Sequence, residues 1–256
     1  MWGGVMRLWL LGILVLPLCA AAEDMVEVIE RVKPSIVAVG TYQKTRSPAF
    51  KFRGTGFVVG DGTWVATNAH VLPEKMTEDQ QEVLAITART ASGKEFILRP
   101  ARVAATDRAH DAALLKIEGP ALPALPLGDS AAVREGKNYA FTGYPIGSVL
   151  GLFPVTHRAM IAAVTPIAIP SGNARGLDAK VIRRISEGPF AVFQLDATAY
   201  PGNSGSPLYD PATGEVVGIV NMVFVKGTKE AALSNPSGIS FAVPIQYLRQ
   251  LLGTAK

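Results

Sequence analysis

Most of the chain alternates apolar and polar residues with a period of two, in short runs interrupted by turn residues such as Gly60-Asp61-Gly62. This pattern is typical of half-buried β-strands. It predicts a first group of strands at residues 35–41, 55–59, 63–67, 82–87, 95–103 and 112–117. A second group is predicted at residues 138–143, 155–165, 190–195, 206–209, 215–225 and 239–243.

The period of three to four that indicates an amphipathic helix occurs only near the two ends. It predicts a helix over residues 25–33, stopped by Pro34, and a closing helix that starts at Pro244 and stops at Gly253. Residues 118–130 are rich in proline and glycine and indicate a linker. Alternating βαβ units are absent from this pattern, so we expect an all-β fold, as two antiparallel barrels or a sandwich.

The first 22 residues have the composition of a secretory signal. Arg7 precedes an apolar run that ends at Leu18, and small residues follow up to Ala22. We expect cleavage after Ala22, which leaves residues 23–120 as the first half and residues 121–256 as the linker, second half and closing helix. Lipid attachment at Cys19 and an uncleaved anchor are the alternatives, although the apolar run is short for a membrane span.

Composition excludes several other classes of protein. The chain has 256 residues, of which 48% are hydrophobic and 18% charged, which argues against a disordered or coiled-coil protein. Its one cysteine can form neither a disulfide framework nor a cysteine-bound zinc site. The formal net charge of +4 comes from scattered residues, so we expect no nucleic-acid partner. No metal-ligand spacing is present, and we expect neither a metal nor another cofactor.

Three residues suggest a nucleophilic site. His70 follows an apolar strand, Asp111 opens another, and Ser204 lies between two glycines in Gly202-Asn203-Ser204-Gly205. A serine hydroxyl needs a base in contact, and the base needs an orienting carboxylate. Gly202 and Ser204 can also direct their amides at one point, as a developing oxyanion requires.

Each of these residues has a structural alternative when taken alone. His70 could be an ordinary packed histidine, Asp111 a cap at a strand start, and Ser204 part of a Gly-Ser loop. Asp107 and His110 are competing candidates that spacing does not exclude. Because the histidine and aspartate fall in the first group of strands and the serine in the second, the site is expected in the cleft between the two halves.

Together these motifs resemble a chymotrypsin-fold (trypsin-like) serine protease, and most closely the protease domain of the HtrA/Deg family. The matching segments are Thr67-Asn68-Ala69-His70-Val71, Asp111-Ala112-Ala113-Leu114-Leu115-Lys116, Leu127-Gly128-Asp129-Ser130, Pro201-Gly202-Asn203-Ser204-Gly205 and Gly238-Ile239-Ser240-Phe241-Ala242-Val243-Pro244. The resemblance implies two six-stranded β-barrels. It also implies Ser204 as nucleophile, His70 as general base and then acid, Asp111 as orienting carboxylate, and an oxyanion hole at Gly202 and Ser204.

Three features depart from that family's usual pattern, namely the early end of the chain, Ser206 and the length of residues 167–188, and a further residue, Asn203, bears on activation. It stops soon after the closing helix, so we expect no PDZ domain, and trimerisation and PDZ gating are in doubt. Ser206 stands where the family usually has a second glycine. Asn203 is neutral, so it cannot pair with a new N-terminal ammonium as the aspartate of trypsin-like zymogens does. Residues 167–188 form either a regulatory loop or a solvated insertion.

The resemblance also places the substrate-binding residues. Thr198 falls at the base of the primary specificity pocket, and because it is not an acid we expect no trypsin-like preference for lysine or arginine. Residues 219–223, which include Asn221 and Met222, resemble the edge that pairs with an extended substrate. Met222 and Phe241 favour small or medium aliphatic side chains.

Two functions follow. The first is an exported, periplasmic or secreted bacterial serine endopeptidase that acts on unfolded or exposed polypeptide segments, with no stable membrane insertion after signal cleavage. The second is a latent or inactive HtrA-like chaperone or binding protein. The sequence leaves the oligomeric state open.

Overall fold

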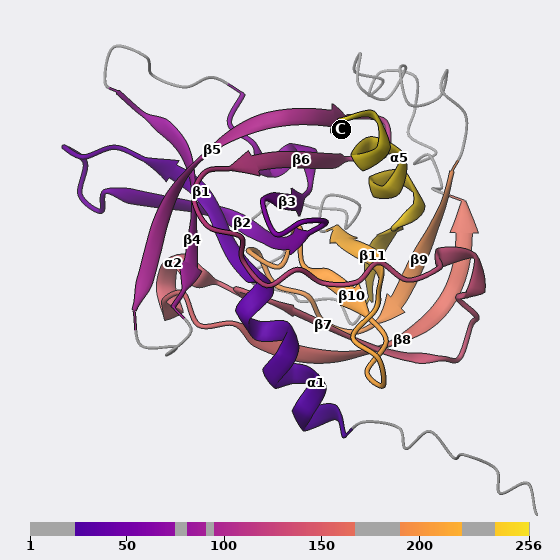
Figure 1. The fold of residues 1–256 in the computed structure, drawn as a ribbon. Coiled ribbons are helices and arrows are strands. Elements are labelled where there is room, and N and C mark those ends of the chain that lie inside the picture. Colours follow the sequence, from indigo (N-terminus) through magenta and orange to yellow (C-terminus); the bar gives the residue numbers. More distant parts are fainter. Residues whose placement is uncertain (1–23, 75–80, 91–94, 167–189, 222–238, 256) are drawn as a thin grey trace, which may run out of the picture.

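The strands of the protein form two closed antiparallel barrels (Figure 1). The computed structural model describes residues 24–74, 81–90, 95–166, 190–221 and 239–255. The order in the first barrel is β1-β2-β3-β6-β5-β4, and in the second it is β10-β11-β12-β9-β8-β7. The predicted all-β class and the two six-stranded barrels are therefore confirmed.

Each predicted strand corresponds to a strand of the structure. The first barrel contains β1 (Ile36–Tyr42), β2 (Phe50–Val59), β3 (Trp64–Thr67), β4 (Val83–Arg89), β5 (Phe96–Asp107) and β6 (Ala112–Ile117). The second contains β7 (Asn138–Gly143), β8 (Val155–Pro166), β9 (Ala191–Asp196), β10 (Pro207–Tyr209), β11 (Val216–Asn221) and β12 (Ile239–Pro244).

Two strands of the first barrel are longer than their apolar runs. β2 begins at Phe50 rather than at residue 55, because the alternating segment 50–53 pairs with the end of β1. β5 continues to Asp107 because a bulge between Val103 and Ala105 lets its pairing with β6 resume. Of the predicted strand at 215–225, residues 222–225 lie outside the described residues.

The two predicted helices are present, with one correction to their bounds. α1 (Met25–Val32) is capped by the Asp24 side chain, which accepts a hydrogen bond from Val26 N. α5 (Gln246–Thr254) starts later and ends later than predicted. Pro244 is still paired with Gly218 in the sheet, so it is the last residue of β12 and not the start of the helix. Short helical turns also occur at η1 (Lys33–Ser35), η2 (Ala69–Val71), η4 (Ser130–Ala132) and α2 (Gly147–Leu150).

A shared apolar core holds the barrels against each other. Ile36 and Phe57 of the first barrel pack in one buried cluster with Tyr144 and Ile219 of the second and with Leu248 of α5. Each barrel also has its own interior cluster. Because the shared cluster is continuous across both halves, it fixes the relative position of the loops that meet between them.

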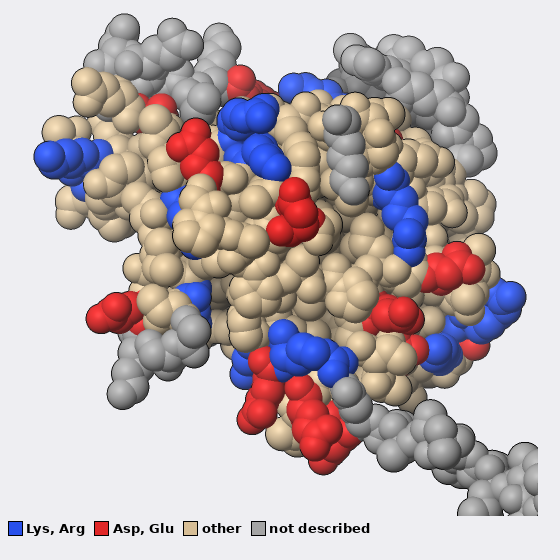
Figure 2. Space-filling model, in the orientation of Figure 1, with Lys and Arg blue, Asp and Glu red and all other residues tan. Residues whose placement is uncertain are grey.

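Charged residues do not gather by sign on the face shown in Figure 2, where acidic and basic side chains are interspersed over a mostly uncharged surface.

Among the helices of the described residues, none is long and apolar enough to cross a bilayer.

Candidate functional site

Asp111 lies just before β6 in an unusual backbone conformation, with φ 52°. A non-glycine residue with positive φ costs conformational energy unless its surroundings hold it in place. Here the Asp111 carbonyl accepts hydrogen bonds from Ala69 N at 3.1 Å and from Asn68 Nδ2 at 3.0 Å. The segment after β3 therefore holds Asp111 and turns its side chain toward η2.

His70 lies in η2 and is joined to Asp111 twice. Asp111 Oδ1 accepts from the His70 backbone N at 2.9 Å, and Asp111 Oδ2 lies 2.6 Å from His70 Nδ1. Asp111 is buried, at 5% exposure, whereas the His70 ring is partly open to solvent. The pair fixes the ring and directs Nε2 away from the carboxylate, as a base for a nucleophile requires.

A third bond to the Asp111 carboxylate comes from the second barrel. Asn221, the last residue of β11, donates from Nδ2 to Asp111 Oδ2 at 2.7 Å, and its side chain is fully buried. Asn221 was expected to belong to a strand edge that pairs with an extended substrate, and its side chain bonds the carboxylate instead of facing outward. The Asn221 amide acts on the carboxylate, and backbone contact of this residue with substrate stays a prediction.

The competing candidates Asp107 and His110 form a separate pair. Asp107 Oδ1 accepts from His110 N at 3.0 Å, and Asp107 Oδ2 lies 2.6 Å from His110 Nδ1. The His110 ring stacks on Tyr247 of α5, with ring centroids 3.6 Å apart, and meets Phe190 edge-on. The two are therefore engaged with each other and with α5, while Asp111 is the carboxylate that reaches His70.

The loop that carries Ser204 needs its glycines. Gly202 has φ 102° and Gly205 has φ 88°, values that residues with a Cβ rarely adopt. A Cβ at Gly205 would also overlap Thr55 O in β2. The tight turn lets Gly205 N donate to Val220 O at 3.0 Å and leaves Ser204 at 6% exposure between the barrels.

The amides expected to bind an oxyanion are not used internally. Within the described residues, neither Gly202 N nor Ser204 N donates a hydrogen bond, whereas Asn203 N donates to Tyr200 O at 2.9 Å. The Pro201 carbonyl accepts from Ile146 N at 2.7 Å. Because C=O and N–H point in opposite directions in a trans peptide, this bond directs the Gly202 N–H away from Ile146.

The His70 and Ser204 loops meet at one glycine of β2. A Cβ at Gly54 would lie 2.7 Å from Val71 and 3.0 Å from Ser204 O, so only glycine lets both loops approach this strand. No hydrogen bond joins the Ser204 hydroxyl to the His70 ring among the described residues. Such contacts commonly tighten when substrate binds.

Two of the expected specificity residues are described: Thr198 lies in the segment 197–199, and Phe241 lies in strand β12, which is bonded to that segment through Ser240. Thr198 is half-buried between Ala197 and Ala199, and Ser240 of β12 holds that segment: its Oγ donates to Ala197 O at 2.7 Å and accepts from Ala199 N at 3.0 Å. Phe241, the next residue of β12, is also half-buried. Met222 lies outside the described residues.

Residues 219 and 220 do not offer the free edge that was expected. Ile219 pairs with Pro207 on one side and Val243 on the other, and Val220 N donates to Ser206 O at 2.9 Å. These residues are inside the closed barrel, where both neighbouring positions are taken, so an extended substrate cannot add there.

Sequence reasoning missed Thr55, Ser240 and the role of Asn221. Ser240 and Asn221 reach groups far away along the chain, and no local pattern marks them. Thr55 lies in Gly54-Thr55-Gly56, which indicated only a strand in close backbone contact. That contact is with the Ser204 loop, since Thr55 N donates to Ser204 O at 2.9 Å.

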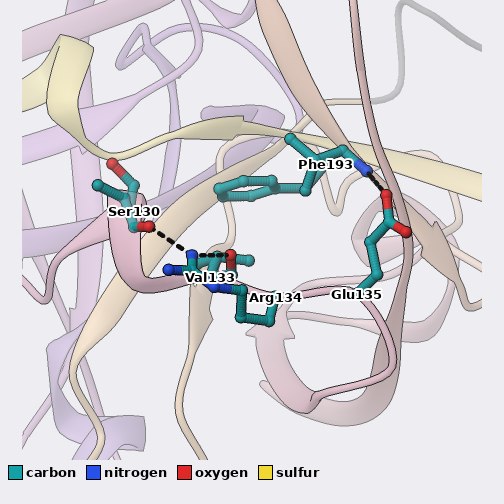
Figure 3. Close-up of a pocket in the computed structure, with 7 residues that line it drawn as sticks. Ser130, Val133, Arg134, Glu135 and Phe193 are labelled. Carbon is teal, nitrogen blue, oxygen red and sulfur yellow. Dashed lines mark hydrogen bonds between the residues drawn. The ribbon is translucent and has the colours of Figure 1, made fainter.

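A hollow of about 560 Å³ lies elsewhere, at one end of the second barrel (Figure 3). Arg134 and Glu135 line it together with Val164 and Phe193, and Glu135 Oε1 accepts from Val164 N at 2.8 Å. None of the candidate catalytic residues lines this hollow. In the described part of the chain, no three His, Cys, Asp or Glu side chains converge as metal ligands would.

The two barrels, with a carboxylate–imidazole pair on the first and a glycine-flanked serine loop on the second, define a chymotrypsin-like fold. Comparison with known families agrees: residues 54–219 match the model of the trypsin-like peptidase domain. The match covers more than half of the chain, and the chain belongs to the trypsin-like peptidase family.

Relatives confirm the resemblance to HtrA-type proteases. A probable periplasmic serine endoprotease DegP-like from Marinomonas sp. (strain MWYL1) is 32% identical over 203 residues, which are 79% of this chain and 35% of that protein. Serine protease HTR4 from Bos taurus is 30% identical over 231 residues, which are 88% of this chain and 40% of that protein. The chain therefore spans little more than a third of the length of these relatives.

One solved structure agrees in fold. An HtrA-type protease with a tripeptide superimposes with a TM-score of 0.61 at 23% identity, covering 91% of this chain and 63% of that one.

Proposed function

We propose that the protein is a serine endopeptidase that hydrolyses peptide bonds through an acyl-enzyme, with Ser204, His70 and Asp111 as its catalytic residues. The observation that carries the proposal is the pair of hydrogen bonds that the Asp111 carboxylate makes to His70. One buried carboxylate holds both the backbone N and Nδ1 of His70, on the loop that faces the Ser204 turn across Gly54. This arrangement leaves Nε2 as the free base.

In the first half of the reaction, Ser204 Oγ attacks the carbonyl carbon of the scissile bond and passes its proton to His70 Nε2. The carbonyl oxygen becomes an oxyanion that accepts hydrogen bonds from Gly202 N–H and Ser204 N–H, two amides that donate no hydrogen bond within the part of the chain that the structure describes. Asp111 stays ionised and stabilises the imidazolium through Nδ1–H. His70 then protonates the leaving amine, the C–N bond breaks, and an ester to Ser204 remains.

In the second half, a water gives its proton to His70 Nε2 and attacks the ester carbon. The same two amides bind the second oxyanion. When the C–O bond to Ser204 breaks, His70 returns the proton to Oγ and the carboxylic acid product leaves. Every step uses only water and the side chains and amides named above.

The substrate is polypeptide in an extended, accessible form, because the scissile carbonyl must reach Ser204, which is only 6% exposed between the two barrels. Thr198, held by Ser240 through the adjacent backbone, supplies no negative charge to a primary pocket, so cleavage after small or medium aliphatic residues is favoured over cleavage after lysine or arginine. Phe241, which is half-buried, contributes apolar surface to this pocket.

The protein is exported, and its site of action is the bacterial periplasm or the outside of the cell. Two observations support this: the signal-like composition of residues 1–22 and the printed name of the Marinomonas relative, a periplasmic endoprotease. Cleavage after Ala22 releases the chain from the membrane.

A fluorophosphonate probe tests the catalytic assignment. We expect covalent labelling of the folded wild-type protein and none of Ser204→Ala or His70→Ala. Ser130→Ala is the matched control, because Ser130 is also a buried serine of the second half but lies in η4. If the folded wild type is not labelled, the enzymatic proposal is wrong and a latent or binding protein replaces it.

A further inference from the structure

The hydroxyl of Thr55 lies between two backbone segments that border the nucleophile. Thr55 Oγ1 donates to Gly202 O at 2.6 Å and accepts from Tyr144 N at 3.0 Å. The side chain is fully buried. One hydroxyl of the first barrel therefore uses both its donor and an acceptor position to join two loops of the second barrel.

These contacts bear on the direction of the Gly202 amide. The peptide plane before Gly202 is fixed by the bond from Ile146 N to Pro201 O, and the plane after it is fixed by Thr55. Glycine adopts positive and negative φ about equally readily, so Gly202 has no preference of its own for φ 102°. Its conformation depends on the two flanking bonds.

The same hydroxyl supports the other flank as well. Ile146, which holds the Pro201 carbonyl, belongs to the segment that begins at Tyr144, and Tyr144 N is bonded to Thr55 Oγ1. Tyr144 is in turn anchored, since its fully buried hydroxyl donates to Ile36 O at 3.1 Å. Both bonds that orient the Gly202 amide thus lead back to the first barrel through Thr55.

The backbone of Thr55 completes the arrangement. Thr55 N donates to Ser204 O at 2.9 Å, and Thr55 O accepts from Thr67 Oγ1 at 2.7 Å. The residue therefore bonds the carbonyls of Gly202 and Ser204 and is itself bonded to β3. Among the hydrogen bonds of the described residues, no other residue of the first barrel reaches both of these carbonyls.

The surroundings of the hydroxyl leave no easy substitute. The side-chain amide of Asn203 and the hydroxyl of Ser206 are fully buried without hydrogen-bond partners among the described residues. A Cβ at Gly143 would lie 2.9 Å from both Thr55 Oγ1 and Asn203 Oδ1. These two polar atoms therefore pack against the backbone of Gly143, which carries no side chain. Loss of the Thr55 hydroxyl would add two more unpaired groups, Gly202 O and Tyr144 N, to a region that already holds several.

From this geometry we propose that Thr55 is a positioning residue for the oxyanion site: its hydroxyl, through Gly202 O and Tyr144 N, keeps the Gly202 N–H directed at the position of the oxyanion. The inference rests on the proposed function. It predicts that removal of the hydroxyl lowers turnover and leaves the affinity for polypeptide largely intact, because Thr55 touches the loop behind the nucleophile and no substrate-binding surface.

The test uses Thr55→Val, which has nearly the same shape and lacks the hydroxyl, and Thr55→Ser, which keeps the hydroxyl and lacks the methyl group. Thr142→Val is the matched control: Thr142 is equally buried, its hydroxyl bonds Tyr209 and Thr156, and the residue lies on the face of β7 opposite to Gly143. Each protein is compared for fluorophosphonate labelling rate and for kcat and KM on fluorescein-labelled casein, after its fold is verified by circular dichroism.

We expect kcat of Thr55→Val to fall about 10- to 100-fold, below the roughly 100- to 1000-fold loss on complete removal of an oxyanion donor. KM should change by less than about threefold, since the substitution removes no contact that binds substrate equally in the ground state and the transition state. Thr55→Ser should recover most of the turnover, and Thr142→Val should match the wild type. Should Thr55→Val fail to fold, Thr55→Ala replaces it and is read in the same way.

The outcomes separate this inference from the function on which it rests. An active wild type with an equally active Thr55→Val would overturn the role of Thr55 alone. Equal losses in Thr55→Val and Thr142→Val, or no recovery in Thr55→Ser, would assign the effect to packing and also overturn it. A folded wild type that neither reacts nor cleaves would overturn the proposed function and this inference together.

Discussion

The bond between Asn221 and Asp111 provides the sharpest test of the site. Asn221→Ala removes the only donor from the second barrel that reaches the Asp111 carboxylate within the described residues. The two bonds from His70 remain. Because the carboxylate is 5% exposed, water cannot readily take the place of the lost amide.

The magnitude follows from the kind of bond that is lost. A buried hydrogen bond to a charged group contributes about 1.5–3 kcal/mol, and the Asn221–Asp111 distance of 2.7 Å is typical of a charge-assisted bond. If this energy is lost fully in the transition state, the rate falls about 10- to 150-fold. We therefore expect a fall in kcat within this range and a decrease of similar free energy in stability.

Two other asparagine substitutions serve as controls for the loss of turnover and stability in Asn221→Ala. Asn68→Ala removes a bond to the neutral backbone carbonyl of Asp111, which contributes only about 0.5–1.5 kcal/mol. Asn138→Ala, at the exposed start of β7, should leave both quantities unchanged. The assays are casein turnover and urea unfolding. If Asn221→Ala keeps wild-type turnover and stability, or costs no more than Asn68→Ala, the reasoning about the carboxylate is refuted.

Two further predictions concern stability. Gly143→Ala should destabilise the fold by about 1–3 kcal/mol in urea unfolding, since the new methyl group overlaps Ser206 Oγ and lies 2.9 Å from Thr55 Oγ1 and Asn203 Oδ1. Addition of Ser206→Gly should recover the part of the loss that comes from Ser206; strictly additive costs would contradict this. Burial lowers the pKa of His157 below its ordinary value of 6.5. The folded state then binds this proton less readily than the unfolded state, so the contribution to stability is complete above about pH 6.5 and is lost as the pH falls below it. The melting temperature of the wild type should fall more between pH 7.5 and 5.5 than that of His157→Phe, and equal falls would show that His157 is not responsible.

The sequence alone predicted only those parts of the site that depend on neighbouring residues in the chain. The turn at Gly202-Asn203-Ser204-Gly205 was recognisable because positive φ demands glycine wherever the turn is placed. Ser206, an unexpected side chain at that point, is accommodated because it faces Gly143 of β7. That compensation joins a loop residue just before β10 to a residue of β7, and neither residue predicts the other.

Only the fold distinguishes Asp111 from Asp107 as the carboxylate of the candidate site. Asp107 and Asp111 have comparable sequence surroundings, and each bonds a histidine through a backbone N and Nδ1. The two aspartates differ in the surroundings of the histidine that each one bonds. His110 stacks on Tyr247 of α5, whereas His70 lies on the loop that meets the Ser204 turn at Gly54.

The sequence by itself determined the strand positions, the all-β class and the three residues of the candidate triad, because alternation and turn chemistry act over a few neighbouring residues. Only the tertiary structure decided which strands close each barrel and what supports the site. The His70–Asp111 contact spans 41 residues, the Asn221–Asp111 bond 110 and the Thr55–Gly202 bond 147. The first of these contacts forms within the first barrel and the other two form when the barrels dock through a shared core, and no local periodicity records the relative position of surfaces that meet only after folding.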